Sequence, residues 1–178
     1  LAAIANLHEG SGLTAVLDHL AGLHAGISAA DPAWASLERL AAQGAWVKLS
    51  GWYRLQASTP YEALQSHIGR VAALMGEHLV WGSDWPHTAF EHGALPPYDS
   101  LWQPVVQALG ASRAAAVRDA LPALSQALAG LVTLREQHPG EDGSARLLVG
   151  LQDGQTVESV LLPRDGVCVS SQVGCAVG

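Results

Sequence analysis

The sequence is poor in basic residues. Lys and Arg together number 9 against 16 Asp and Glu, which gives the 178-residue chain a net charge of −7. Nucleic-acid surfaces need clustered positive charge, so we expect this chain by itself to bind no nucleic acid. Cysteine is equally scarce, and both copies, Cys168 and Cys175, fall near the C-terminus. Two such cysteines exclude a disulfide framework and favour a reducing, cytoplasmic location.

Long apolar runs are missing as well. The run Leu1–Leu7 is far shorter than the ~20 residues that cross a bilayer, and it lacks the features of a signal peptide. We therefore expect no membrane partner. Because the sequence has no initiator Met, we also expect the chain to start inside a larger protein. What is present is a globular composition, 49% hydrophobic and 14% charged, with a length that suits one domain or slightly more.

Three short apolar segments predict strands, at Leu13–Leu17, Ala45–Leu49 and Leu79–Trp81. Two helix-like segments lie between them. The first, Ala33–Gln43, follows an Asp-Pro pair that is typical of a helix start, and the second is Pro60–Met75. The order β-α-β-α-β predicts an α/β fold with a parallel sheet covered by helices.

The second part of the chain has a different pattern. Residues 112–134 are rich in Ala and Leu and predict a helix that is broken at Pro122, and residues 136–144 predict a linker. Two β-type runs around Asp153-Gly154 predict a hairpin. The expected organisation has three parts: a β/α part over 1–110, a helical connector and linker over 111–145, and a hairpin segment over 146–178.

Polar residues follow each of the three predicted strands. In parallel α/β folds, the residues just beyond the carboxyl ends of the strands form the active site. Asp84 can act there as a general base on water, and His19 can polarise a carbonyl oxygen; the same two could bind a divalent metal. Arg54 suits a substrate carboxylate. The candidate residues are Asp84 and His19 as catalytic groups and Tyr53, Arg54 and His87 as substrate-binding groups.

Structural interpretations stand beside these functional ones. Asp84 follows Gly-Ser and could be a turn or cap residue, and His87 follows a Pro and could be a surface loop residue. Lys48, within a predicted strand, could lie at a sheet edge or reach a pocket. The tryptophans near the strands favour packing rather than a binding platform: Trp46, Trp52, Trp81 and Trp85.

Three segments, "TAVLDHLAG", "WVKLSGWYRL" and "LVWGSDWPH", resemble in order and spacing the C-terminal half of the amidohydrolase-related family. The nearest branch contains 2-pyrone-4,6-dicarboxylate hydrolase and sugar lactonases. The resemblance covers roughly residues 1–108 and implies a (β/α)8 barrel whose last three strands are present here. It also implies that Asp84 activates the hydrolytic water, that His19 is the sixth-strand His and that Arg54 contacts the substrate carboxylate.

The first-strand His-x-His pair of that family has no counterpart in the chain. A divalent metal is therefore possible rather than required. A barrel cannot close with about three β/α units, so we expect the isolated chain to be inactive.

The two cysteines leave several interpretations open. A separation of seven residues does not indicate zinc, which favours closer pairs, and two unpaired thiols are an alternative. However, "DGQTVESVLLPRDGVCVSSQVGCAVG" resembles the N-terminal part of radical-SAM rRNA adenine-C2 methyltransferases, over about residues 121–178. That resemblance implies Cys175 as the first [4Fe–4S] ligand and Cys168 in a supporting role. The cluster and S-adenosylmethionine would be bound only if the chain continued past Gly178.

The sequence therefore yields three functional hypotheses. The first is a hydrolase of a lactone or cyclic ester that carries a carboxylate. The second is a fragment of a radical-SAM RNA methyltransferase, and the third is an inactive fusion of two enzyme fragments joined near residues 108–122. The oligomeric state stays open.

Overall fold

The computed structural model describes residues 1–84, 87, 95–152, 154–163 and 167–169. Contacts within the chain divide it into two compact units, Leu1–Ala127 and Leu128–Gly178. No helix in the described part of the chain is both long and apolar enough to cross a membrane.

The first unit contains a three-stranded parallel sheet. Its strands are β1 (Val16–Leu17), β2 (Trp46–Leu49) and β3 (Leu79–Trp81), paired in the order β1-β2-β3. The predicted parallel order is confirmed, although β1 is shorter than the expected Leu13–Leu17 because Leu13 is exposed and outside the ladder. With all strands parallel, their carboxyl ends meet at one edge.

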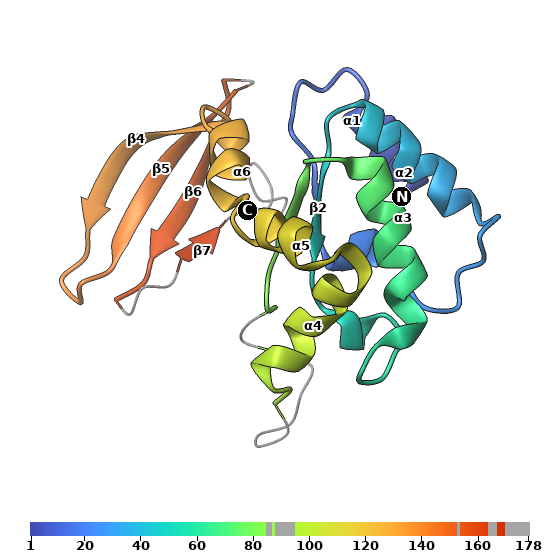
Figure 1. The fold of residues 1–178 in the computed structure, drawn as a ribbon. Helices are drawn as coiled ribbons and strands as arrows, with labels where there is room; N and C mark the ends of the chain where they lie inside the picture. The colour runs from blue at the N-terminus through green and yellow to red at the C-terminus, as the bar shows by residue number, and fades with distance from the viewer. Residues whose placement is uncertain (85–86, 88–94, 153, 164–166, 170–178) are drawn as a thin grey trace. The chain divides into compact units, whose positions relative to one another are not determined.

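Two helices complete the β-α-β-α-β pattern, α2 (Pro32–Ala42) and α3 (Gln65–Met75). The Asp31 carboxylate caps α2 by accepting a hydrogen bond from the Ala33 amide at 2.8 Å. Figure 1 shows α2 and α3 side by side against the sheet. The core between these layers is apolar and fully buried: Leu37, Leu40, Val47, Leu49, Ile68 and Val71.

Further elements extend the first unit beyond the predicted pattern. The short η1 (His19–Gly22) and η2 (Trp52–Arg54) follow strands β1 and β2 directly. A third short element, η3 (Glu62–Leu64), precedes α3, which therefore begins later than the expected helix start at Pro60. The remaining helices are α1 (Ala2–His8), α4 (Tyr98–Leu109), α5 (Ala111–Arg118) and α6 (Leu121–Leu128).

The second unit is an antiparallel sheet with strand order β4-β5-β6-β7. The expected hairpin around Gly154 is confirmed by the pairing of β5 with β6. The strands are β4 (Val132–Pro139), β5 (Ala145–Leu151), β6 (Thr156–Leu161) and β7 (Val167–Val169).

Strand β4 corrects the sequence prediction. Residues 132–134 were expected in a helix and 136–139 in a linker, but both lie in β4. The helical segment also divides before Pro122, into α5 and α6, rather than at it. Gly130 follows the end of α6 and has a φ of +87°, a conformation that stops a helix. Val132 can then pair with Leu151 of β5, and this tertiary pairing overrides the local helical preference.

Candidate active site

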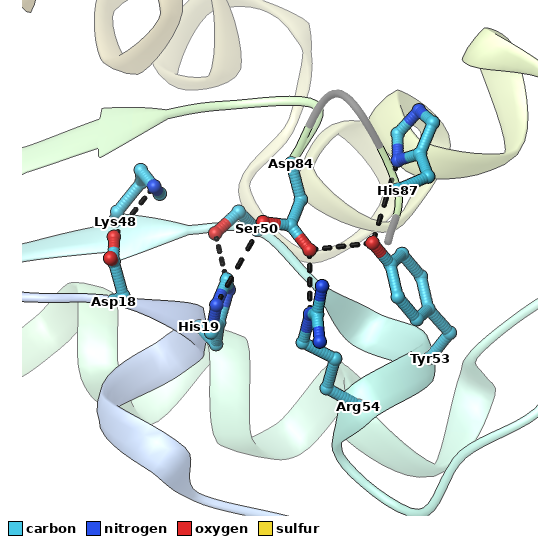
Figure 2. Close-up of polar contacts among 8 residues, drawn as sticks. All are labelled: Asp18, His19, Lys48, Ser50, Tyr53, Arg54, Asp84 and His87. Atoms are coloured by element: carbon cyan, nitrogen blue, oxygen red, sulfur yellow. Dashed lines mark hydrogen bonds and ion pairs between the residues drawn. The ribbon is translucent and has the colours of Figure 1, made fainter. Parts of the chain in front are cut away.

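The candidate site forms where the three parallel strands end. Strand β1 leads into His19, strand β2 leads through Ser50 into η2 with Tyr53 and Arg54, and strand β3 leads to Asp84. Figure 2 shows these side chains pointing toward one another around the Asp84 carboxylate. The predicted convergence of strand-end residues is thus present in the geometry.

Asp84 is the centre of the contacts. Its Oδ2 accepts a hydrogen bond from Nε of Arg54 at 2.7 Å and another from the Tyr53 hydroxyl at 2.5 Å. Its Oδ1 lies 3.8 Å from Nε2 of His19. The Asp84 side chain is only 13% exposed, so these neighbours replace most of the water that would solvate the carboxylate.

The contacts set the protonation states. Burial raises the pKa of Asp84, but the hydrogen bonds from Arg54 and Tyr53 and the nearby His19 outweigh it, so that the pKa lies below its ordinary value. Burial and the hydrogen bond to Asp84 raise the pKa of Tyr53 to about 12. The hydrogen bond to Asp84 also raises the pKa of Arg54. Near neutral pH the site therefore holds a carboxylate, a neutral phenol and a guanidinium.

The His19 ring is held from two sides. Its Nδ1 lies 3.2 Å from the hydroxyl oxygen of buried Ser50. Gly51 packs against the ring, and its φ of +62° and lack of a side chain leave room for the imidazole. Ser50 and Gly51 directly follow the predicted strand Ala45–Leu49, but nothing in the sequence indicates that they touch His19.

His87 is buried, at 6% exposure, which excludes the interpretation of a surface loop residue. Its Nδ1 lies 3.4 Å from the Tyr53 hydroxyl oxygen, and the two rings meet edge to face with centroids 6.1 Å apart. His87 thus contacts the residue that donates to Asp84.

The tryptophans in the described part of the chain have packing contacts, as expected. Trp52 is fully buried and donates from Nε1 to the Leu101 carbonyl at 2.8 Å. Trp46 stacks on His78 with ring centroids 4.9 Å apart. Trp85 lies outside the described residues.

A complete metal site is not formed by the described residues alone. Among them, no three His, Cys, Asp or Glu side chains gather as metal ligands do. His19 and Asp84 supply one nitrogen and one carboxylate, and Oδ2 of that carboxylate already accepts from Arg54 and Tyr53. The pair therefore does not fit a resident metal without further ligands.

The predicted cluster ligand Cys175 lies outside the described residues, as does the side chain of Cys168. The backbone of Cys168 belongs to β7 and pairs with Val160 of β6.

The backbone at the site is unusual. His19, Asp84 and His87 have φ values of 50°, 64° and 56°. Side-chain-bearing residues rarely adopt this left-handed conformation, and such strain gathers at functional sites. Leu20, Ala21, Gln56 and Tyr61 also have positive φ values, so the feature extends beyond the site but includes three of the predicted site residues.

A model of the amidohydrolase family matches residues 1–128. The chain belongs to the amidohydrolase family. The match extends beyond residue 108, the limit expected from the sequence, and includes helices α4 to α6.

Solved structures support this assignment. An Agrobacterium tumefaciens protein in its apo form aligns with a TM-score of 0.60 and 27% identity, over 70% of this chain and 45% of that one. A probable 2-pyrone-4,6-dicarboxylic acid hydrolase of Acinetobacter baumannii, crystallised with citric acid, aligns with a TM-score of 0.54 and 25% identity, over 66% of this chain and 44% of that one. The chain thus spans less than half of either relative.

A segment of 63 residues is similar to a different class of protein. It is 81% identical to a probable RNA methyltransferase of Leptothrix cholodnii and 76% identical to one of Azoarcus sp.. The segment makes up 35% of this chain and 18% of each of those relatives. The resemblance to RNA methyltransferases noted in the sequence is therefore confirmed for a segment of this length.

Proposed function

We propose that the strand-end site is the hydrolytic centre of an enzyme that opens a lactone or cyclic ester bearing a carboxylate. The observation that carries this proposal is the meeting of Asp84, Arg54 and His19 at the ends of three successive parallel strands. A carboxylate can act as the general base, a fixed cation can bind the substrate carboxylate, and an imidazole can stabilise the developing oxyanion during hydrolysis of a carboxylated ester.

Asp84 is the general base in this proposal. Water attacks the ester carbonyl carbon while its proton passes to the Asp84 carboxylate, and the same proton then moves to the departing ring oxygen as the C–O bond breaks. Because the lowered pKa makes Asp84 a weak base, proton transfer accompanies the attack rather than preceding it. His19, 3.8 Å from Oδ1 of Asp84, is placed to donate to the carbonyl oxygen as negative charge develops there.

Arg54 binds the substrate carboxylate. Its side chain is 32% exposed, so an anion can reach the guanidinium while Nε holds Asp84. Tyr53 keeps Asp84 oriented, and His87 supports Tyr53. The Acinetobacter relative, named for a dicarboxylic acid substrate and crystallised with citric acid, supports a ligand of this chemistry.

A chimera tests the proposal. The part of the Agrobacterium relative without a counterpart here is joined to this chain, and the product is assayed against 2-pyrone-4,6-dicarboxylate and sugar lactones. The Asp84→Asn variant is expected to lower kcat by about 100-fold or more. Asp119→Asn, which removes an exposed carboxylate paired with Arg118, is the matched control and is expected to have no effect. Equal turnover in Asp84→Asn and the parent chimera would refute the role of Asp84.

The methyltransferase-like segment supports a second proposal. Its 81% identity over 63 residues favours the start of a radical-SAM RNA methyltransferase, with Cys175 as the first cluster ligand and Cys168 in support. A chain extended past Gly178 with the Leptothrix sequence is reconstituted with iron and sulfide. We expect a cluster absorption band that Cys175→Ala abolishes and Cys168→Ala retains. A band that survives Cys175→Ala would contradict the assignment.

The third hypothesis, an inactive fusion of two fragments, applies to the 178-residue chain alone. It predicts no turnover of lactones by the unextended chain. Measurable hydrolysis by that chain, lost in Asp84→Asn, would overturn it.

A further inference from the structure

Lys48 is the only lysine in the sequence, and it lies within the central strand of a parallel sheet. Such strands are mostly apolar because both faces are covered. Its neighbours Val47 and Leu49 are fully buried in the apolar core. Since side chains alternate along a strand, Lys48 points to the opposite face, together with Ser50 two residues later.

The ammonium group lies at the edge that carries the proposed active site. Nζ of Lys48 is 2.6 Å from Oδ1 of Asp18, the residue before His19. The stem of Lys48 passes over Gly82, the residue directly after β3, where an added Cβ would lie only 3.2 Å from Cδ of Lys48. Figure 2 shows the Lys48–Asp18 pair beside the His19, Ser50 and Asp84 group. Lys48 therefore spans from β2 toward the ends of β1 and β3.

We propose that Lys48 binds a second anionic group of the ligand, separate from the group bound by Arg54; this inference rests on the proposed hydrolase function. Asp18 holds the ammonium in the absence of ligand. Its side chain is 57% exposed and that of Lys48 is 30% exposed. An ion pair that solvent reaches so readily contributes little stability, and a ligand carboxylate can take the place of Asp18.

This arrangement determines specificity. Arg54 follows β2 in η2, whereas Lys48 lies in β2 itself on the face of Ser50. A ligand with two carboxylates can contact both cations, and one with a single carboxylate can contact only one. The site is thus expected to prefer dicarboxylates over monocarboxylates of the same ring.

The single lysine permits a direct measurement on the 178-residue chain. Reductive methylation with ¹³C-formaldehyde labels only Nζ of Lys48 and the α-amino group of Leu1, and it keeps both charges. The labelled chain is titrated with 2-pyrone-4,6-dicarboxylate and, separately, with 2-pyrone-6-carboxylate. We expect the dicarboxylate to shift the Lys48 methyl signal and the monocarboxylate to leave it in place.

Variants extend the test. Lys48→Met is expected to weaken dicarboxylate binding about tenfold, because the loss of one charged hydrogen bond changes affinity by about this factor. The same variant is expected to change monocarboxylate binding by less than about twofold. Asp18→Asn removes the competing carboxylate and is expected to tighten dicarboxylate binding, which a purely structural ion pair would not do. Arg118→Gln, which alters an exposed cation paired with Asp119, is the control and is expected to bind like the parent.

The outcomes separate the two proposals. The role of Lys48 is refuted if the Lys48 methyl signal stays in place and Lys48→Met binds both ligands like the parent. If Arg54→Gln abolishes binding of both ligands in the same experiment, the hydrolase proposal stands. If Asp18→Asn weakens dicarboxylate binding, the proposed competition is also wrong. If neither ligand binds the parent chain, the binding role of Arg54 fails and the inference fails with it.

Discussion

Gly51 offers a quantitative test of how the site is built. Its φ is +62°, and a Cβ added there would collide with the His19 ring. Gly44, at the end of α2, has a similar φ of +79° but nothing within 4 Å of an added Cβ. Substituting Ala at the two positions imposes the same kind of backbone penalty, and only the substitution at Gly51 adds a steric conflict.

The two costs can be separated in magnitude. A left-handed Ala is disfavoured by about 1–2 kcal/mol relative to Gly, and we expect this loss for Gly44→Ala. Forcing extra volume into a packed site costs a further ~1–3 kcal/mol, so we expect a total loss of about 2–5 kcal/mol for Gly51→Ala. The conflict ends if the ring is removed, so in a His19→Ala background Gly51→Ala should cost only the backbone penalty.

Urea unfolding followed by tryptophan fluorescence measures these differences. All six tryptophans precede residue 103, so the signal reports the first unit alone. The loss for Gly51→Ala should exceed that for Gly44→Ala in the parent chain and equal it in the His19→Ala chain. If the two substitutions differ by less than about 0.5 kcal/mol in the parent, the packing of His19 on Gly51 is refuted.

Three further predictions concern the first unit. Arg54→Gln should raise the pKa of Asp84, since its strongest favourable contact is removed, and carboxylate NMR titration that finds no rise would contradict this. The folded pKa of Asp84 lies below its ordinary value of 3.8, so its contribution to stability is present above that pH and is lost as the pH falls through the folded pKa. The free energy of unfolding of Asp84→Asn, measured in urea, should therefore decrease less steeply with falling pH than that of the parent chain, and an equally steep decrease would argue against it. Trp52→Phe removes the shorter of two side-chain hydrogen bonds to the Leu101 carbonyl, which also accepts from Nε1 of Trp81 at 3.3 Å. The loss of one net hydrogen bond should lower the free energy of unfolding by about 0.5–1.5 kcal/mol, measured by urea unfolding and circular dichroism. An unchanged free energy of unfolding would show that the Trp81 hydrogen bond alone satisfies this carbonyl.

The sequence predicts the parallel sheet well because its strand signals and helix signals alternate along the chain. The strands are short apolar runs separated by helical segments, and connections of that kind force parallel pairing. Local helix signals such as Asp31 are also reliable, since the cap forms within three residues. Strand β4 was missed because it has no such local signal. All of its residues are exposed, so no alternation of buried and exposed positions marks it, and only pairing with β5 makes it a strand.

The site was predicted in its residue types but not in its contacts. Asp84, His19 and Arg54 were selected because they follow strands, and the structure brings them together. Tyr53, predicted as a substrate-binding residue, donates a hydrogen bond to Asp84, a contact that the sequence did not indicate. Which partner a long side chain reaches depends on loop geometry across neighbouring strands, and a sequence read along one strand does not contain that information.

The backbone supplies an independent argument that these residues serve a function. Many left-handed positions in the described part of the chain are glycines, such as Gly22 and Gly44, where φ is positive at no steric penalty. Seven described residues with side chains also have positive φ: His19, Leu20, Ala21, Gln56, Tyr61, Asp84 and His87. At His19, Asp84 and His87 the chain keeps side chains in that conformation, each at a cost of about 1–3 kcal/mol. A turn that served folding alone would be more stable with glycine. Three of these seven residues, His19, Asp84 and His87, belong to one connected set of contacts around Asp84 and Tyr53, so part of the strain lies where the proposed chemistry needs these groups in place.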